Sequence, residues 1–115
     1  MKKIALVAFN GEPMCFVHVL LNGLEMKEKG YDVKLVIEGS AVKAAAALSN
    51  TEHNFHQLYK KTVSAGIIDA VCHACAAKMG VLEKLQAENL PIKGDMKGHP
   101  ALSNYLEAGY EIITF

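Results

Sequence analysis

The sequence predicts a single-domain α/β protein with a doubly wound, parallel five-stranded sheet and helices on both faces. Short apolar, β-branched runs alternate with longer helical patterns along the whole chain. The runs IALVAF and VKLVI are nearly continuous in apolar residues, which is typical of strands that are buried on both faces. Residues 1–115 suffice for one hydrophobic core, and no linker or repeat divides them. We therefore expect one domain over residues 1–115.

The elements follow from these runs in order. We expect strands over 3–9, 32–37, 67–72 and 110–115, and a weaker strand near 91–94. Helices are expected near 14–29, 40–49, 53–65, 76–89 and 100–108, the fourth either continuous or interrupted at Gly80. Short connections and right-handed crossovers then predict a flavodoxin-like arrangement of strands.

The residues at the expected helix ends agree with these boundaries. Ser40 suits an N-cap, and Pro100 suits a first helical turn. Gly30, Gly66 and Gly109 can each end a helix in the left-handed conformation.

Composition excludes several classes of function. The formal net charge is zero and all 12 basic residues are lysine, so neither a direct nucleic-acid interface nor an anionic membrane surface is expected. No glycine-rich dinucleotide or nucleoside-triphosphate loop occurs, and NGEP lacks a flavodoxin's hydroxyl-rich phosphate loop. The first residues, MKKIALVAF, open like a signal peptide, but the apolar run ends there without a cleavage pattern. We expect a cytoplasmic protein with reduced thiols.

The segment VCHACAAKMG carries the strongest chemical signal. Cys72 closes the third expected strand and Cys75 falls in the first turn of the next helix. Unpaired amides at that helix start favour a thiolate, and the three-residue spacing lets one thiol attack the other. In a reduced compartment a C-x-x-C pair is more often reactive or metal-binding than structural, although two small buried residues would give the same pattern.

Other polar residues are expected near the same edge of the sheet. Glu38 follows the second strand, where a carboxylate could tune a thiol or simply face solvent. Cys15 and His18 lie one turn apart in the first helix, and with Cys72 and Cys75 they would supply four zinc ligands. A partly buried, hydrogen-bonded His18 is the other interpretation. His99 precedes Pro100 and is assigned to a helix start.

The chain resembles the DsrE/DsrF-like family, which includes the TusD-type sulfur-relay subunits. The resemblance rests on MCFVHVLLNGLEMKEKGYDVKLVIEG after the first strand, on DAVCHACAAKMGV, and on LSNYLEAGYEIITF at the end. It implies that Cys72 accepts sulfane sulfur as a persulfide, that donor and acceptor proteins are its partners, and that the chain forms homotrimers or hexamers. Cys75 departs from the TusD-like pattern, which has an apolar residue there.

The leading hypothesis is a cytoplasmic sulfur carrier, sulfurtransferase-like and without a resident cofactor or metal. Cys72 would be its working group, Cys75 its assistant, and Glu38 and His18 would tune or orient the thiols. One alternative is a zinc-binding or non-catalytic oligomeric module that uses Cys15, His18, Cys72 and Cys75. Another is a thiol-disulfide redox sensor built on Cys72 and Cys75.

Overall fold

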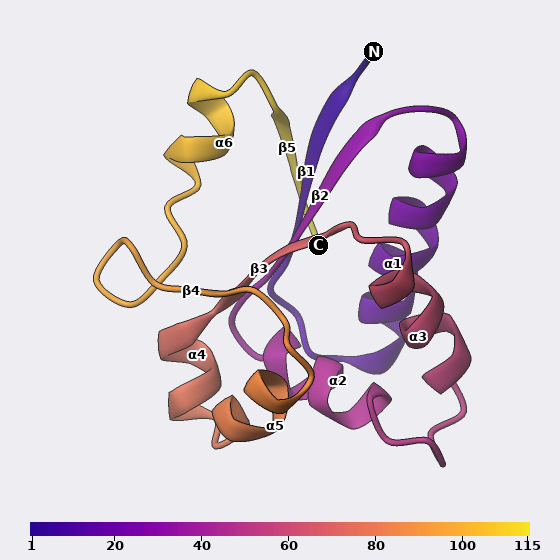
Figure 1. The fold of residues 1–115 in the computed structure, drawn as a ribbon, viewed down its shortest axis with the longest axis vertical. Coiled ribbons are helices and arrows are strands. Elements are labelled where there is room, and N and C mark those ends of the chain that lie inside the picture. The colour runs from indigo at the N-terminus through magenta and orange to yellow at the C-terminus, as the bar shows by residue number, and fades with distance from the viewer.

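The computed structural model describes all residues, Met1–Phe115, as one α/β domain. Five parallel strands form its sheet: β1 (Lys3–Ala8), β2 (Asp32–Ile37), β3 (Ile68–Cys72), β4 (Ile92–Lys93) and β5 (Glu111–Thr114). The helices are α1 (Pro13–Glu28), α2 (Ala41–Leu48), α3 (His56–Ser64), α4 (His73–Lys78), α5 (Leu82–Ala87) and α6 (Ser103–Glu107). The expected parallel sheet and single domain are confirmed (Figure 1).

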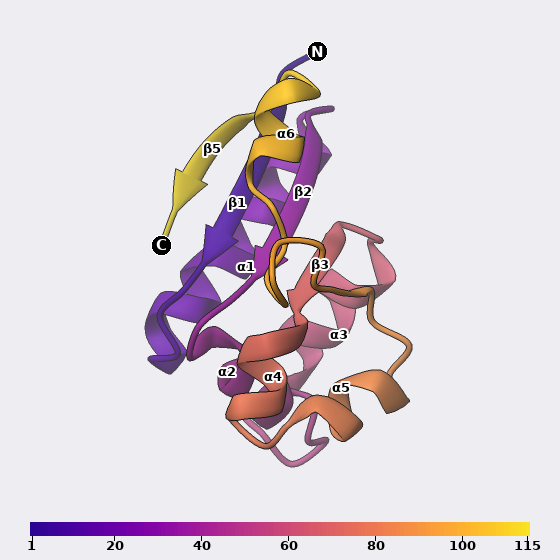
Figure 2. The same cartoon turned by 90° about the vertical axis from the view of Figure 1, so that its left-hand side faces the viewer.

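The strand order is β4-β3-β2-β1-β5, whereas flavodoxin itself has the order 2-1-3-4-5. The first three crossovers all step in the same direction across the sheet. Right-handed crossovers in one direction place their helices on one face, and the return from β4 to β5 places its helix on the other. Helices α1 to α5 therefore lie on one side of the sheet and α6 on the other (Figures 1 and 2).

Both faces of the central strands are buried, but by unequal layers. Ile4, Leu6 and Ala8 of β1 belong to the large core under α1 to α5, which contains 21 buried residues. Ala5 and Val7 face the other way, into a cluster of 5 buried residues that includes Tyr105 of α6. Alternate side chains of an apolar strand thus serve two cores, as the sequence pattern predicts.

Some element boundaries differ from the sequence-based expectations. Ser40 does not cap α2, because its hydroxyl accepts the N–H of Gly11 and donates to the carbonyl of Phe9 instead. Helix α6 begins at Ser103, after the turn at Pro100 rather than at it. The expected helix over 76–89 is two helices, interrupted at Gly80, whose φ is +74°.

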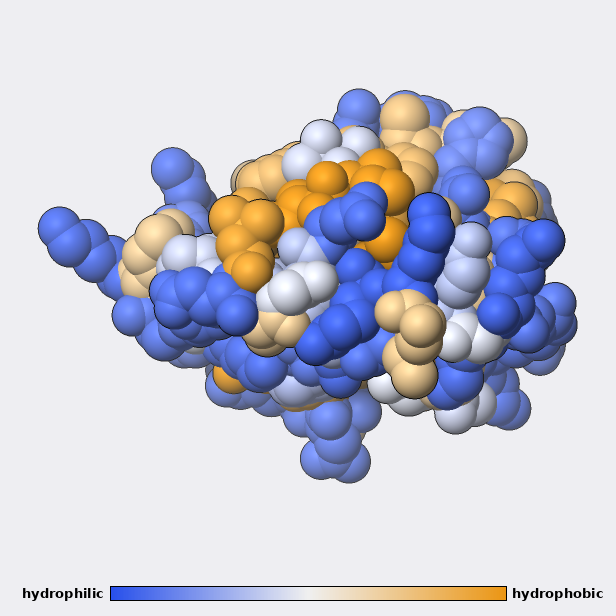
Figure 3. Space-filling view, turned by 90° about the horizontal axis from the view of Figure 1, so that it is seen from above, coloured by the Kyte–Doolittle hydropathy of each residue, from blue (hydrophilic) through white to orange (hydrophobic).

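No helix is both long and apolar enough to cross a bilayer. Hydrophobic surface is visible at the end of the molecule where β1, β2 and β5 begin, with hydrophilic side chains around it (Figure 3). Exposed large hydrophobic residues include Leu106 of α6 and Ile113 of β5.

Two substitutions on α1 test how the large core is built. Phe16 is fully buried, and we expect Phe16→Ala to lower the free energy of unfolding by about 3–5 kcal/mol because it leaves a cavity under the sheet. Leu21 is 49% exposed on the same helix, and Leu21→Ala is the matched control, expected to change that free energy by no more than about 0.5 kcal/mol. Urea denaturation measures both, and equal losses would contradict this assignment of the buried face.

Candidate functional site

The site lies at the carboxyl ends of β2 and β3, which are neighbouring strands. Ile37 pairs with Val71, so the next residues along the two strands, Glu38 and Cys72, lie at the same edge. Cys72 is the last residue of β3 and also the N-cap of α4, where its Sγ accepts the N–H of Cys75 at 3.3 Å. The strand end therefore fixes one thiol, and the first turn of α4 carries the second beside it.

His99 completes this group, which the sequence did not reveal. Its Nδ1 lies 3.1 Å from Cys72 Sγ and 3.7 Å from Cys75 Sγ. It comes from the loop that follows β4, not from the helix start to which we assigned it, because α6 begins only at Ser103. The available signal was topological: β4 is parallel to β3, so the loop after β4 emerges at the edge that holds Cys72.

Backbone contacts hold the His99 loop against α4. The carbonyl of Gly98 accepts the N–H of Ala74 at 2.8 Å, so the loop meets the first turn of the helix. Gly98 has φ +94°, and a Cβ there would lie 3.0 Å from the Cβ of Ala74. Only glycine combines this backbone conformation with so close an approach.

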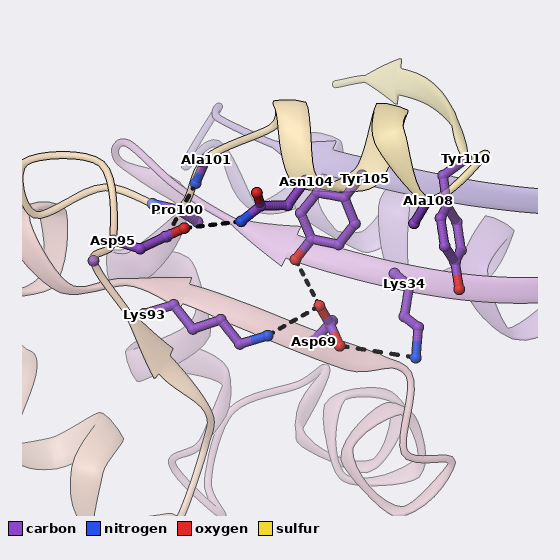
Figure 4. Close-up of a pocket in the computed structure, with 11 residues that line it drawn as sticks. Lys34, Asp69, Lys93, Asp95, Pro100, Ala101, Asn104, Tyr105, Ala108 and Tyr110 are labelled. Carbon is purple, nitrogen blue, oxygen red and sulfur yellow. Dashed lines mark hydrogen bonds and ion pairs between the residues drawn. The ribbon is translucent and has the colours of Figure 1, made fainter.

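A polar network on the far side of the sheet anchors the same loop to α6 (Figure 4). Asp95 accepts hydrogen bonds from the N–H of Ala101 and from Asn104 Nδ2, at 3.2 and 2.8 Å. Asp69 on β3 accepts hydrogen bonds from the Tyr105 hydroxyl at 2.6 Å and from Lys93 Nζ at 3.2 Å. These groups line a pocket of about 390 Å³, and because they pair with one another we assign the pocket a supporting role.

The charges in this network agree with its geometry. Burial alone would raise the pKa of Asp69, but the hydrogen bonds from Tyr105 and Lys93 outweigh it and hold that pKa below its usual value. The hydrogen bond from Asn104 likewise lowers the pKa of Asp95. Both carboxylates are therefore ionised near neutral pH, and they tie β3, the loop and α6 together.

Glu38 is a buried acid at the centre of the edge. Its exposed fraction is 6%, and burial raises the pKa of its carboxyl, an effect that the nearby His99 partly offsets. Next to it, the N–H of Gly39 points to Cys75 Sγ at 3.2 Å. The β2–α2 connection thus contributes both an acid and an amide to the surroundings of the thiols.

Burial also governs the thiol of Cys72. Its residue is fully buried, and this burial, with the neighbouring Cys75 thiol, raises the pKa of Cys72 to about 12. Cys75 is only half-buried, so it is the thiol of the pair that faces the surface. At neutral pH the resting Cys72 is a protected, protonated thiol with an imidazole nitrogen in contact, and His99 can accept its proton.

Cys15 and His18 are not brought to this group. The set of three ligand atoms that the structure assembles comes from Cys72, Cys75 and His99, all within 4.8 Å of one another. His18 is exposed on α1, and the expected four-ligand set with Cys15 is not formed. The spacing of these two residues is that of a metal pair, but both lie on α1 and neither joins the group of ligand atoms at the start of α4.

These features define a class of protein: a small parallel α/β domain with two thiols and an imidazole at the carboxyl edge of its sheet. The chain belongs to the DsrE/DsrF-like family, whose model matches residues 3–115. The resemblance noted from the sequence is thereby confirmed.

The similar proteins carry no stated activity. The chain is 37% identical over 97 residues to the uncharacterized protein MJ0733 of Methanocaldococcus jannaschii, which covers 84% of this chain and 77% of that protein. It is 48% identical over 40 residues to an uncharacterized protein of Archaeoglobus fulgidus, a match covering 35% of this chain and 66% of that one.

A solved structure with a similar fold is among the matches. It is described as a conserved protein of unknown function, BT1422 from Bacteroides thetaiotaomicron, with a TM-score of 0.73. The match covers 99% of this chain and 95% of that chain at 18% identity, so it bears on the fold alone.

The buried thiol gives the stability of the protein a specific pH dependence. Above the ordinary thiol pKa of 9.0 the unfolded chain loses the Cys72 proton, whereas the folded chain keeps it up to about 12. The unfolded state then binds fewer protons, so this contribution to stability is complete below pH 9.0 and is lost as pH rises toward 12. We expect the free energy of unfolding, measured with urea, to fall less steeply over this interval in Cys72→Ala than in wild type. Burial also raises the pKa of Tyr59 and Tyr105, but these groups act in both proteins, and parallel curves would contradict the assignment to Cys72.

The Gly98 contact allows a second test. Gly98→Ala should push the loop from α4 and expose Cys72, so we expect faster alkylation of Cys72, measured by peptide mapping. Gly30→Ala is the matched control, because Gly30 has a similar φ of +87° and nothing within 4 Å of an added Cβ. Both variants should lose about 1 kcal/mol of stability through the left-handed backbone. Equal alkylation rates in the two variants would show that Gly98 does not hold the loop.

Proposed function

We propose that this protein is a sulfur carrier that holds sulfane sulfur as a persulfide on Cys72. Membership of the DsrE/DsrF-like family supports a sulfur-relay-like role at the level of the family. The observation that carries the proposal for this chain is the contact of 3.1 Å between Cys72 Sγ and His99 Nδ1. A thiol so deeply buried needs a base beside it before it can act as a nucleophile.

The transfer step can be written with these groups. His99 takes the proton of the Cys72 thiol, and the thiolate attacks the terminal sulfur of a persulfide. A new sulfur–sulfur bond forms on Cys72, the old one breaks, and the donor thiol leaves with the electron pair. The persulfide anion on Cys72 can accept hydrogen bonds from the N–H of Cys75 and from protonated His99, both of which already contact Cys72 Sγ.

Burial makes Cys75 the natural point of entry. Cys72 has no exposed surface, whereas Cys75 is half-buried and its Sγ accepts the N–H of Gly39. We therefore place the first transfer, from a donor protein, on Cys75. Attack by Cys72 on the outer sulfur of that persulfide moves the sulfur inward and returns Cys75 as a thiol. Attack on the inner sulfur would instead form a disulfide and release hydrosulfide.

The remaining site residues have secondary roles in this proposal. Glu38, a buried acid near both Cys72 and His99, would favour the protonated imidazole that forms when His99 takes the thiol proton. His18 lies on the exposed face of α1 and has no place in the transfer step.

The partners are proposed from the chemistry and the family. A carrier needs a donor protein with a persulfide and an acceptor protein that consumes one, and thiols of this kind work in a reducing compartment such as the cytoplasm. The hydrophobic surface in Figure 3 is compatible with a homotrimer or hexamer, the assembly that the family resemblance suggests. Neither a nucleic acid nor a membrane is needed.

Sulfur loading of single-cysteine variants tests the proposal. The purified protein is exposed to a sulfane-sulfur donor, and intact mass with peptide mapping follows the gain of one sulfur atom. We expect wild type to hold the sulfur on Cys72 and Cys72→Ser to hold none there. His99→Ala should load about 100-fold more slowly, because it has lost the base. Cys75→Ser should also load more slowly, because the accessible thiol is missing.

Cys15→Ser is the control, since Cys15 is a half-buried cysteine outside the group. It should load as wild type does. Wild type that carries the sulfur on Cys75 and none on Cys72, or loss of loading in Cys15→Ser, would contradict the proposal.

A further inference from the structure

Cys72, Cys75 and His99 also have the arrangement of metal ligands. They form the one group of three or more potential ligands in the chain whose ligand atoms all lie within 4.8 Å of one another. Two thiolates and an imidazole are borderline-soft donors, which suit zinc and not magnesium or calcium. The ligands come from the end of β3, the first turn of α4 and the loop after β4.

The nitrogen-to-sulfur distances are close to those around a tetrahedral zinc ion. With Zn–S near 2.3 Å and Zn–N near 2.0–2.1 Å, neighbouring ligand atoms of a tetrahedron are about 3.6–3.8 Å apart. His99 Nδ1 lies 3.7 Å from Cys75 Sγ, which matches, and 3.1 Å from Cys72 Sγ, a distance that must lengthen by about 0.5 Å when the ion binds. From this geometry we infer that Cys72, Cys75 and His99 bind one Zn²⁺ ion, with a fourth position open to water. Sulfur carriage is not required for this inference.

The surroundings of the three ligands support a cation. Each sulfur already receives a backbone N–H, from Cys75 at 3.3 Å and from Gly39 at 3.2 Å, and such bonds stabilise metal-bound thiolates. Glu38 is 6% exposed and lies near Cys72 and His99.

Binding of Zn²⁺ to these ligands balances in protons and charge. Each thiol gives up one proton when its sulfur binds the metal, and His99 binds through a neutral imidazole nitrogen, so one Zn²⁺ displaces two protons. The resulting centre of two thiolates and one divalent ion is neutral. No oxidant or reductant takes part. The loop that carries His99 is already held in place by the contact between Gly98 and Ala74, so the ligands need little rearrangement.

Cobalt and zinc titrations test the site. The fully reduced protein, prepared without any sulfur donor, is titrated with Co²⁺, and Zn²⁺ affinity is then measured by competition with a chromophoric chelator. We expect one ion per chain, the intense visible bands of tetrahedral Co²⁺ and thiolate-to-cobalt charge transfer. Cys75→Ser and His99→Ala should each weaken Zn²⁺ binding by at least about 100-fold.

Cys15→Ser and His18→Ala are the matched controls, and both should bind Zn²⁺ as wild type does. Cys75 and His99 are only half-buried, so their variants should fold, which circular dichroism checks, whereas Cys72 belongs to the interior. Absence of tetrahedral bands at stoichiometric Co²⁺ would overturn the inference. Undiminished Zn²⁺ affinity in His99→Ala, or its loss in the Cys15 or His18 controls, would do the same. Because no sulfur is transferred, this outcome is independent of the sulfur-loading experiment.

Discussion

Right-handed crossovers, together with the strand order β4-β3-β2-β1-β5, require the chain to return from one edge of the sheet to the other after β4. The path of that return determines the rest of the site. Strand β4 lies beside β3, so the chain leaves it at the carboxyl edge, next to the end of β3 where Cys72 lies. The returning segment must then cross the face opposite α1 to α5. His99 is carried past the two thiols on the way, and α6 covers the second core at the end of it.

Much of the fold could be predicted from the sequence, because continuous apolar strands and glycine-terminated helices are local signals. The same local reasoning correctly placed Cys72 at a strand end and Cys75 in the next helical turn. Local reasoning did not identify His99, because no periodicity links a residue in an irregular loop to a cysteine 24 positions earlier in the chain. Local reasoning also grouped Cys15 and His18 with the two thiols, although the structure does not. Their spacing is that of a ligand pair, but only the packing of α1 decides which way the pair faces. The strand order also depends on long-range pairing, which local pattern does not encode.

The two uses proposed for the thiols draw on one physical property. A fully buried thiol of high pKa is inert, yet here an imidazole nitrogen touches it and a second thiol lies between it and the surface. Anything that accepts or replaces the Cys72 proton, whether His99 or a metal ion, turns this protected sulfur into a strong nucleophile or ligand. Which of the two prevails in a given solution depends on the concentrations of free metal and of sulfane sulfur, because both require the same lone pairs on sulfur.

The unequal covering of the sheet has a dynamic consequence. Between β4 and β5 the chain buries little more than Pro100 and Tyr105, whereas the opposite layer buries residues from five helices. Segments with few buried contacts open locally, at far lower free energy than global unfolding, and exchange their amide hydrogens first. This sparsely buried segment is also the one that holds His99 over Cys72. The thiol therefore lies between the large core on one side and a sparsely buried segment on the other, so local opening of that segment can expose it while the large core remains folded.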